Sequence, residues 1–203
     1  MRRKHFAATA LVVLGGLTLA ACGGDDSMSG MAGMDSSTST PSESASSDTV
    51  GGFNEADVTF ATDMIPHHRQ AVAMAELADS RAESPEVKAL AKEIMAAQDP
   101  EIQTMSEWLT AWGEPVPEDM SGMDMSTSMP GMMSADKMDE LMNASGAEFD
   151  TMFLTMMIEH HNGAIEMAKT EQAEGEYPDA VALAQEIEKA KTEEIARMQE
   201  LLG

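Results

Sequence analysis

The chain has 203 residues, of which 36 are acidic and 12 are basic, so its formal net charge at pH 7 is −24. This excess of negative charge argues against binding to nucleic acid and against electrostatic attachment to anionic lipid. Its single cysteine excludes a framework of internal disulfides and a metal site built from several thiolates.

Residues 1–22 have the pattern of a bacterial lipoprotein signal peptide. Three basic residues at positions 2–4 precede an apolar run that is too short for a membrane span and ends in small residues. The run ends in Leu-Ala-Ala-Cys, which resembles a lipobox, and the resemblance implies that Cys22 becomes the lipidated first residue. We therefore expect an exported protein that its lipid anchors to the outer face of the cell membrane. Loss of the three basic residues brings the formal charge to about −27.

Two further segments are rich in small and polar residues. Residues 23–51 contain Ser, Thr, Gly, Asp and Met with almost no large apolar side chains, which predicts a disordered tether between the lipid and the folded domain. Residues 113–135 repeat this composition and predict a long exposed connection. That connection belongs to a flexible, Met-rich linker at 113–145.

The folded part of the chain, within residues 52–203, is an internal duplication. Residues 57–109 align with 150–202 at a constant offset of 93 without a gap, and 23 of the 53 aligned positions are identical. The two halves, 52–112 and 146–203, are therefore expected to share one fold.

Each half predicts two helices. In the first helix, apolar residues and a histidine recur every three or four positions from Phe60 to Ala78, as on one face of a helix. The second helices are expected to begin near Pro85 and Pro178, because proline suits the first helical position. Two such hairpins joined by a long Met-rich connection predict an all-α, ferritin-like four-helix bundle.

Local signals refine these helices. Ser84 precedes Pro85 and can cap its helix. Pro66 and Pro100 lie inside helical runs whose equivalents in the second half carry glutamate, which forms helices well. These two prolines are therefore expected to kink their helices rather than break them.

All four histidines that remain after signal removal occur as two adjacent pairs at equivalent positions of the two halves. Imidazole is the commonest metal ligand among side chains. The helical stripe directs His67 and His160 toward the bundle interior with methionines, and it places the second histidine of each pair on the flank. The candidate metal ligands are His67, His68, His160, His161, Met64, Met74, Met157 and Met167. The alternative is that these residues only pack the core and hydrogen-bond across it.

The ligand types favour copper. Neutral imidazole suits copper, zinc, iron or nickel, whereas thioether sulfur favours Cu(I), and Cu(II) stays open. Di-iron bundles use Glu-x-x-His motifs, and no Glu stands three residues before any of the four histidines. The sequence also lacks His-Glu-x-x-His, so no catalytic residue is assigned and an enzyme is not expected.

Nine methionines lie outside the predicted helices among Gly, Ser, Asp and Pro, where helix packing does not account for them. They resemble the methionine-rich segments of periplasmic copper proteins, and the resemblance implies capture of Cu(I). The alternatives are a low-complexity linker and a role as oxidant scavengers. The candidate accessory ligands are Met28, Met31, Met34, Met120, Met123, Met125, Met129, Met132 and Met133.

The sequence resembles the family called domain of unknown function 305 (DUF305). The likeness covers about residues 52–203 and rests on Asp-Met-Ile-Pro-His-His-x-x-Ala-x-x-Met-Ala at 63–75 and its copy Met-Met-Ile-Glu-His-His-x-x-Ala-x-x-Met-Ala at 156–168. The resemblance implies a ferritin-like bundle, usually exported, with copper binding in some members and no established enzymatic activity. Met156 stands where the first copy has Asp63, so the two copies need not form equivalent sites.

The leading interpretation is a lipid-anchored, extracytoplasmic copper-binding protein that buffers copper or exchanges it with a donor or acceptor protein. One alternative is a metal-free structural or interaction lipoprotein with core histidines. Another is a copper redox enzyme, which requires an open coordination position. The sequence leaves open the number of metal sites, the oxidation state of copper, the partner and the oligomeric state.

Overall fold

A computed structural model of the chain describes residues 52–118 and 129–203. These residues form the helices α1 (Glu55–Arg81), α2 (Pro85–Trp112), α3 (Ala135–Asn143), α4 (Gly146–Glu174) and α5 (Pro178–Leu202). The predicted signal peptide, its Cys22 and the predicted tether lie outside the described residues. Six of the nine loop methionines also lie outside them, namely Met28, Met31, Met34, Met120, Met123 and Met125.

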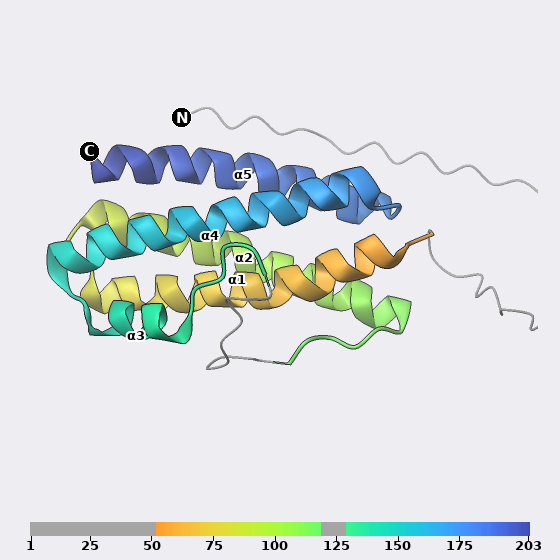
Figure 1. Ribbon diagram of the computed structural model, residues 1–203, viewed down its shortest axis with the longest axis horizontal. Coiled ribbons are helices and arrows are strands. Elements are labelled where there is room, and N and C mark those ends of the chain that lie inside the picture. Colours follow the sequence, from red (N-terminus) through yellow and green to blue (C-terminus); the bar gives the residue numbers. More distant parts are fainter. Residues whose placement is uncertain (1–51, 119–128) are drawn as a thin grey trace, which may run out of the picture. The chain divides into compact units, whose positions relative to one another are not determined.

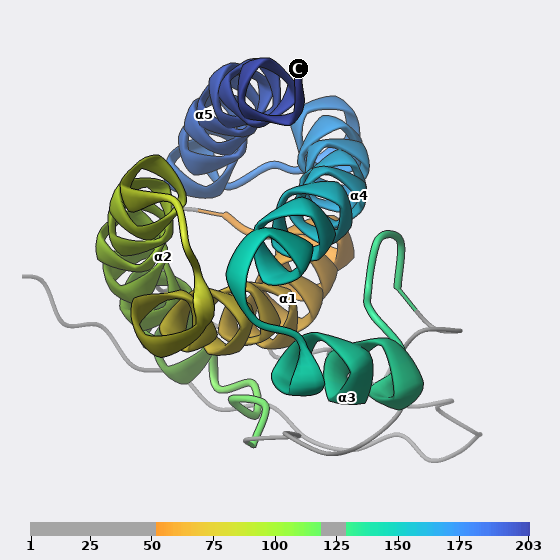
Figure 2. The ribbon, with the colours of Figure 1, turned by 90° about the vertical axis from the view of Figure 1, so that its left-hand side faces the viewer.

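The four long helices form a bundle from two hairpins (Figures 1 and 2). Helix α1 packs along α2, α4 packs along α5, and the hairpins meet mainly where α1 lies against α4. Figure 1 shows that α1 and α4 run in opposite directions. Helix α3 lies beside this bundle, against α1 and α4 (Figure 2). The predicted all-α bundle of two hairpins is confirmed.

The helix ends follow from local sequence signals. Asn54 caps α1 through the backbone N–H groups of the first turn, in a capping box with Asp57. Ser84 caps α2, and proline occupies the first turn of α2 and of α5, as predicted. Neither Pro66 nor Pro100 interrupts its helix, which agrees with the expectation that these prolines do not break it.

Two aspartates at equivalent positions of the duplication tie the hairpins together. The carboxylate of Asp57 in α1 accepts hydrogen bonds from the backbone N–H groups of residues 176–177 in the turn before α5, the shortest at 2.9 Å. Asp150 in α4 accepts from residues 83–84 in the turn before α2, at 3.1 and 2.8 Å. Although burial raises the pKa of Asp57, hydrogen bonds lower it on balance, chiefly from the backbone N–H of Asn54 and the side chain of Glu171, and then from residues 176–177. Each hairpin turn is thus held by a carboxylate from the other hairpin.

The apolar core divides into two clusters, one toward each end of the bundle. One joins the end of α1 to the start of α4, and the other joins the start of α1 to the end of α4. The four buried histidines lie between them in the sequence of both helices. None of the described helices combines the length and the apolar character that crossing a membrane requires.

The second part of the linker packs on the bundle, unlike the exposed connection that its composition predicts. Residues 135–143 form α3, whose Leu141 joins an apolar cluster of the bundle. Met129, Met132 and Met133 are buried, with exposed fractions of 7, 8 and 1%. Packing therefore accounts for these three methionines. Helical periodicity could not reveal it, because they lie on a loop held by contacts distant in sequence.

Candidate metal centre

His67 of α1 and His160 of α4 stack against each other in the middle of the bundle. Their ring centroids are 3.7 Å apart and their planes are inclined by 36°. Both side chains are buried, as the helical stripe predicts. Nε2 of His67 lies 3.1 Å from the carbonyl oxygen of Pro130, to which it donates when it carries the ring proton. The duplication thus brings its two equivalent histidines into contact with each other.

His68 and His161 are fully buried, although the stripe placed them on the flank. Each points toward the second helix of its own hairpin, where Nε2 lies 2.6 Å from a carboxylate, Glu101 in α2 or Glu194 in α5. The flank of the stripe is covered because α2 and α5 pack there. Such a carboxylate keeps the proton on Nε2 and leaves the lone pair of Nδ1 free.

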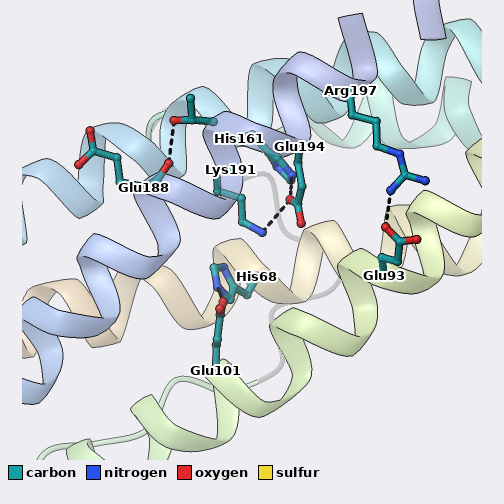
Figure 3. Close-up of polar contacts among 9 residues, drawn as sticks. His68, Glu93, Glu101, His161, Glu188, Lys191, Glu194 and Arg197 are labelled. Carbon is teal, nitrogen blue, oxygen red and sulfur yellow. Dashed lines mark hydrogen bonds and ion pairs between the residues drawn. The ribbon is translucent and has the colours of Figure 1, made fainter. Parts of the chain in front are cut away.

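A buried lysine links the two halves of this arrangement. Lys191 of α5 is 1% exposed, and its ammonium donates to Glu194 at 3.1 Å (Figure 3). Its equivalent in the first half is Gln98. With its amide oxygen turned toward Lys191, Gln98 accepts from that ammonium at 3.1 Å and donates to the backbone of His68 at 3.3 Å. The four histidines with Gln98, Glu101, Lys191 and Glu194 form what is called here the polar core.

Burial keeps the histidines of the polar core uncharged. It lowers the pKa of His67 to about 3, assisted by its neighbour His68, and it lowers the pKa of His161 to about 4 against the opposing hydrogen bond with Glu194. The pKa of His160 falls well below its usual value for the same reason. Burial also lowers the pKa of His68, and the hydrogen bond to Glu101 opposes that shift. Imidazole binds metals in its neutral form, so these side chains are in the ligating state at neutral pH.

The four candidate methionines are divided between the two apolar clusters. Met74 and Met157 belong to one, whereas Met64 and Met167 belong to the other. Each cluster therefore holds one methionine from each half, because α1 and α4 are antiparallel. Met64, Met74 and Met157 are fully buried, and Met167 is partly buried. Thioethers thus stand on both sides of the histidine pairs along α1 and α4.

The end of the Met-rich linker closes over the histidine stack. A Cβ added at Gly163 of α4 would lie 2.1 Å from the carbonyl oxygen of Pro130, so only glycine allows this approach. On the other side, the amide of Gln70 donates to the carbonyl of Met133 at 2.9 Å and accepts from its N–H at 2.7 Å. Gln70 and Gly163 occupy equivalent positions of the duplication. The same position of the repeat thus contacts the linker segment 130–133 from both halves, through the side chain of Gln70 and through the close approach at Gly163.

Replacing Gly163 by alanine is expected to detach residues 129–133 from α4. The new Cβ overlaps backbone atoms of Pro130, which cannot rotate away as a side chain can, and such overpacking typically costs about 1–3 kcal/mol. Amide hydrogen exchange should accelerate in residues 131–133 while the helices keep their protection. The control is Asn162→Ala, one exposed position earlier in the same helix. Unchanged exchange in Gly163→Ala contradicts the role assigned to this glycine.

Buried ring nitrogens without partners make the polar core suitable for a soft metal ion. Both ring nitrogens of His160 and Nδ1 of His67, His68 and His161 have no hydrogen-bond partner among the described residues. Burying such groups unpaired is costly, and a metal ion satisfies a neutral imidazole nitrogen. Across the two described segments, no three His, Cys, Asp or Glu side chains are arranged to hold a metal ion by themselves. Nitrogen ligands alone therefore do not complete a site here.

Sequence reasoning missed the carboxylates and the lysine of the polar core. Glu101 and Glu194 follow their histidines by 33 residues in both halves and are identical in the duplication. That identity was a usable signal, because most other charged positions differ between the halves. Lys191 gave no comparable signal, since its equivalent is Gln98 and a lone lysine is ordinarily exposed.

Comparisons with known proteins identify the family of the chain and solved structures that resemble it. The family model of DUF305, a domain of unknown function, matches residues 57–202. A DUF305 protein from Streptomyces coelicolor, described as secreted, has a similar structure with a TM-score of 0.66 and 33% sequence identity, over 72% of this chain and 91% of that one. No curated protein matches the sequence.

Structures of CopM are also similar to this one. In its Cu(II)-bound form CopM has a TM-score of 0.62 and 37% identity, over 72% of this chain and 95% of that one. In its Cu(I)-bound form the TM-score is 0.60 and the identity 35%, over 71% of this chain and 94% of that one. CopM is thus a copper-binding protein with the same fold.

Proposed function

The chain belongs to the DUF305 family, and we propose that it is an exported, lipid-anchored protein that binds copper in the polar core of its bundle and buffers it or exchanges it with another protein. The observation that carries the proposal is the stack of His67 on His160, whose three buried ring nitrogens lack partners among the described residues. The copper-bound forms of CopM, at 35 and 37% identity, support it.

The proposal assigns Cu(I) rather than a harder ion. Thioether sulfur from Met64, Met74, Met157 and Met167 lies along the same helices as the histidines, and soft ligands favour Cu(I). The formal charges of the polar core point the same way. Glu101 and Glu194 contribute two negative charges and Lys191 one positive charge, so a single monovalent cation brings the buried group to neutrality. Cu(II) remains the second possible state.

The remaining elements of the proposal rest on the sequence. Cleavage before Cys22 and its lipidation leave the bundle on the outer face of the cell membrane, and a secreted relative supports export. Six methionines outside the described residues supply thioethers that capture Cu(I) and deliver it to the histidines. The three buried methionines of the linker can bind Cu(I) only when residues 129–133 leave the bundle. Loading and unloading then require residues 129–133 to move away from His67, which they contact through Pro130.

A melting assay distinguishes copper binding from a purely structural role. For the protein without residues 1–22, Cu(I) supplied under reducing conditions at a free concentration of 100 times Kd is expected to raise stability by about 2.7 kcal/mol. That corresponds to a rise in Tm of roughly 5 to 10 °C for a bundle of this size. Zn²⁺ at the same concentration is expected to give a smaller rise. A metal-free structural lipoprotein predicts that neither ion shifts the melting curve.

A further inference from the structure

A cavity outside the polar core lies between the first turns of α1 and the last turns of α4. Its volume is about 440 Å³. Its buried surface comes from Phe60 and Glu171, and the exposed Glu55 and Glu174 lie at its rim. The half-buried Asp63 completes a set of four acidic lining residues. None of the described residues that line it is basic.

Glu171 supplies a buried carboxyl group to this cavity. Its side chain is 1% exposed, and neither carboxyl oxygen has a hydrogen-bond partner among the described donors. Gly175 leaves room for it, because a Cβ there would lie 2.3 Å from the carboxyl oxygen Oε1. Burial and the neighbouring carboxylate of Asp57 raise the pKa of Glu171 to about 8. As a neutral acid Glu171 can donate to Asp57, whereas as a carboxylate it lacks a partner.

The duplication shows that the residues lining this cavity are particular to one end of the bundle. Three lining residues have the same type at the equivalent position of the other half, namely Glu55 (Glu148), Phe60 (Phe153) and Met167 (Met74). Six other positions differ, and the lining residues are smaller, polar or acidic. The pairs are Ala56 and Phe149, Thr59 and Met152, Asp63 and Met156, Thr170 and Leu77, Glu171 and Ala78, and Glu174 and Arg81. At the other end Phe149 and Met156 are buried in an apolar cluster. Where the opposite end has large apolar side chains, this end therefore has a cavity with acidic residues.

We propose that this pocket binds a small organic cation, an ammonium group on a short apolar chain, with Glu171 as the carboxylate that receives the ammonium. The volume lies within the ordinary range for small-molecule sites, about 300–1,000 Å³. Phe60 and Met167 line the cavity with apolar surface for the chain, and the aromatic ring of Phe60 can attract a cation. A metal ion fits less well, because the described carboxylates do not form a group of three that holds one.

Calorimetric titration of the mature protein with butane-1,4-diamine tests the proposal, with butane-1,4-diol as the uncharged probe of equal length. The diamine is expected to bind and the diol to give no saturable heat. Glu171 loses its proton when the ammonium binds beside it. Glu171→Gln removes this ability to ionise at nearly constant shape and is expected to weaken diamine binding about 10-fold or more. The variant His67→Gln with His160→Gln should bind the diamine like the wild type, which separates this site from the copper centre.

The duplication supplies a matched pair of charge reversals. Glu174→Arg introduces at the rim the residue that the first half carries there, and it is expected to weaken diamine binding by a similar factor. Glu148→Arg makes the same change of charge at the opposite end and should leave binding within about twofold. Equal losses in these two variants mean diffuse attraction to an acidic protein and overturn the proposal. Equal binding of diamine and diol, or binding of Ca²⁺ at Glu171 without binding of the diamine, also overturns it.

Discussion

Replacing His67 and His160 together by glutamine is expected to weaken Cu(I) binding by the bundle at least about 100-fold, since losing even an outer carboxylate of a metal site typically costs 10–100-fold. The two rings lie 3.7 Å apart and present three buried nitrogens without partners among the described residues. Glutamine has similar bulk, so the core is not emptied. Competition with a Cu(I) chelator of known affinity measures the loss.

The control for this variant is Met142→Leu, which removes an exposed thioether from α3 outside the two apolar clusters. It should leave the tight site unchanged. Circular dichroism checks that the double variant remains helical. Wild-type Cu(I) affinity in a folded double variant shows that the histidine stack is not the site. Weak Cu(I) binding that persists in the double variant does not contradict the proposed site, because the variant still has the thioethers of the loop methionines.

Acid is expected to destabilise the metal-free protein strongly between pH 6.5 and pH 5. The unfolded chain protonates its histidines near pH 6.5, whereas burial holds the folded pKa of His67 at about 3 and of His161 at about 4. The unfolded state therefore binds more protons as pH falls, and the free energy of unfolding decreases until the folded values are reached. At about 1.4 kcal/mol per pKa unit, each of these two histidines costs about 2 kcal/mol at pH 5.

One buried group outside the polar core opposes the effect in part. Glu171 has a pKa of about 8 in the folded protein, so it holds a proton that the unfolded chain has lost, and this adds about 2 kcal/mol of stability between pH 6.5 and pH 5.

The charged groups around the histidines do not cancel the effect in that range. The charge of Lys191 opposes protonation of the histidines. The lowered pKa values of His68 and His161 already include the opposing effects of Glu101 and Glu194. Although burial raises it, the hydrogen bond from His161 and the charge of Lys191 lower the pKa of Glu194 to about 2, so its contribution is lost only below about pH 4.5.

Urea unfolding at several pH values tests this prediction. His67 and His161 together remove about 4 kcal/mol, Glu171 returns about 2 kcal/mol, and the lowered pKa values of His68 and His160 add to the loss. The net loss is a large part of the 5–15 kcal/mol that stabilises a typical domain. The variant with all four core histidines changed to glutamine should lose this fall in stability between pH 6.5 and pH 5 and keep only the opposite contribution of Glu171, whatever its stability at pH 7. Bound copper should also protect the wild type there. A wild-type stability that is flat from pH 7 to pH 5 contradicts the burial of neutral histidines.

Much of the fold followed from the sequence because its signals are local. The helical stripes and the prolines at the starts of α2 and α5 predicted the helices, since each depends only on neighbouring residues. The duplication then predicted that the two halves form equivalent hairpins. The stripe also predicted that His67 and His160 face inward. It placed His68 and His161 on the flank but did not show that this flank is buried, because the second helix of each hairpin covers it.

The parts that sequence analysis missed depend on contacts between distant segments. The buried methionines of the linker are held by Gln70 and by the space at Gly163, and both residues stand at a variable position of the repeated His-His motif. The acidic pocket arises at positions where the two halves differ, whereas the predicted metal site rests on positions where they are identical. The exchange of Asp63 for Met156 was noted as a departure from the duplication. That this exchange contributes to a pocket could not be predicted, because only the antiparallel packing of α1 on α4 brings Asp63 to the same cavity as Glu171.

The metal content of the protein purified from cells tests the central claim most directly. The protein is expressed in cultures supplemented with copper or with zinc, and its copper and zinc are measured per chain together with those of the variant in which His67 and His160 are glutamine. The account predicts copper in the wild type from copper-supplemented cells, little zinc from zinc-supplemented cells, and a loss of the tightly held copper in the variant. A wild-type protein that carries zinc in both cultures, or no metal in either, contradicts it.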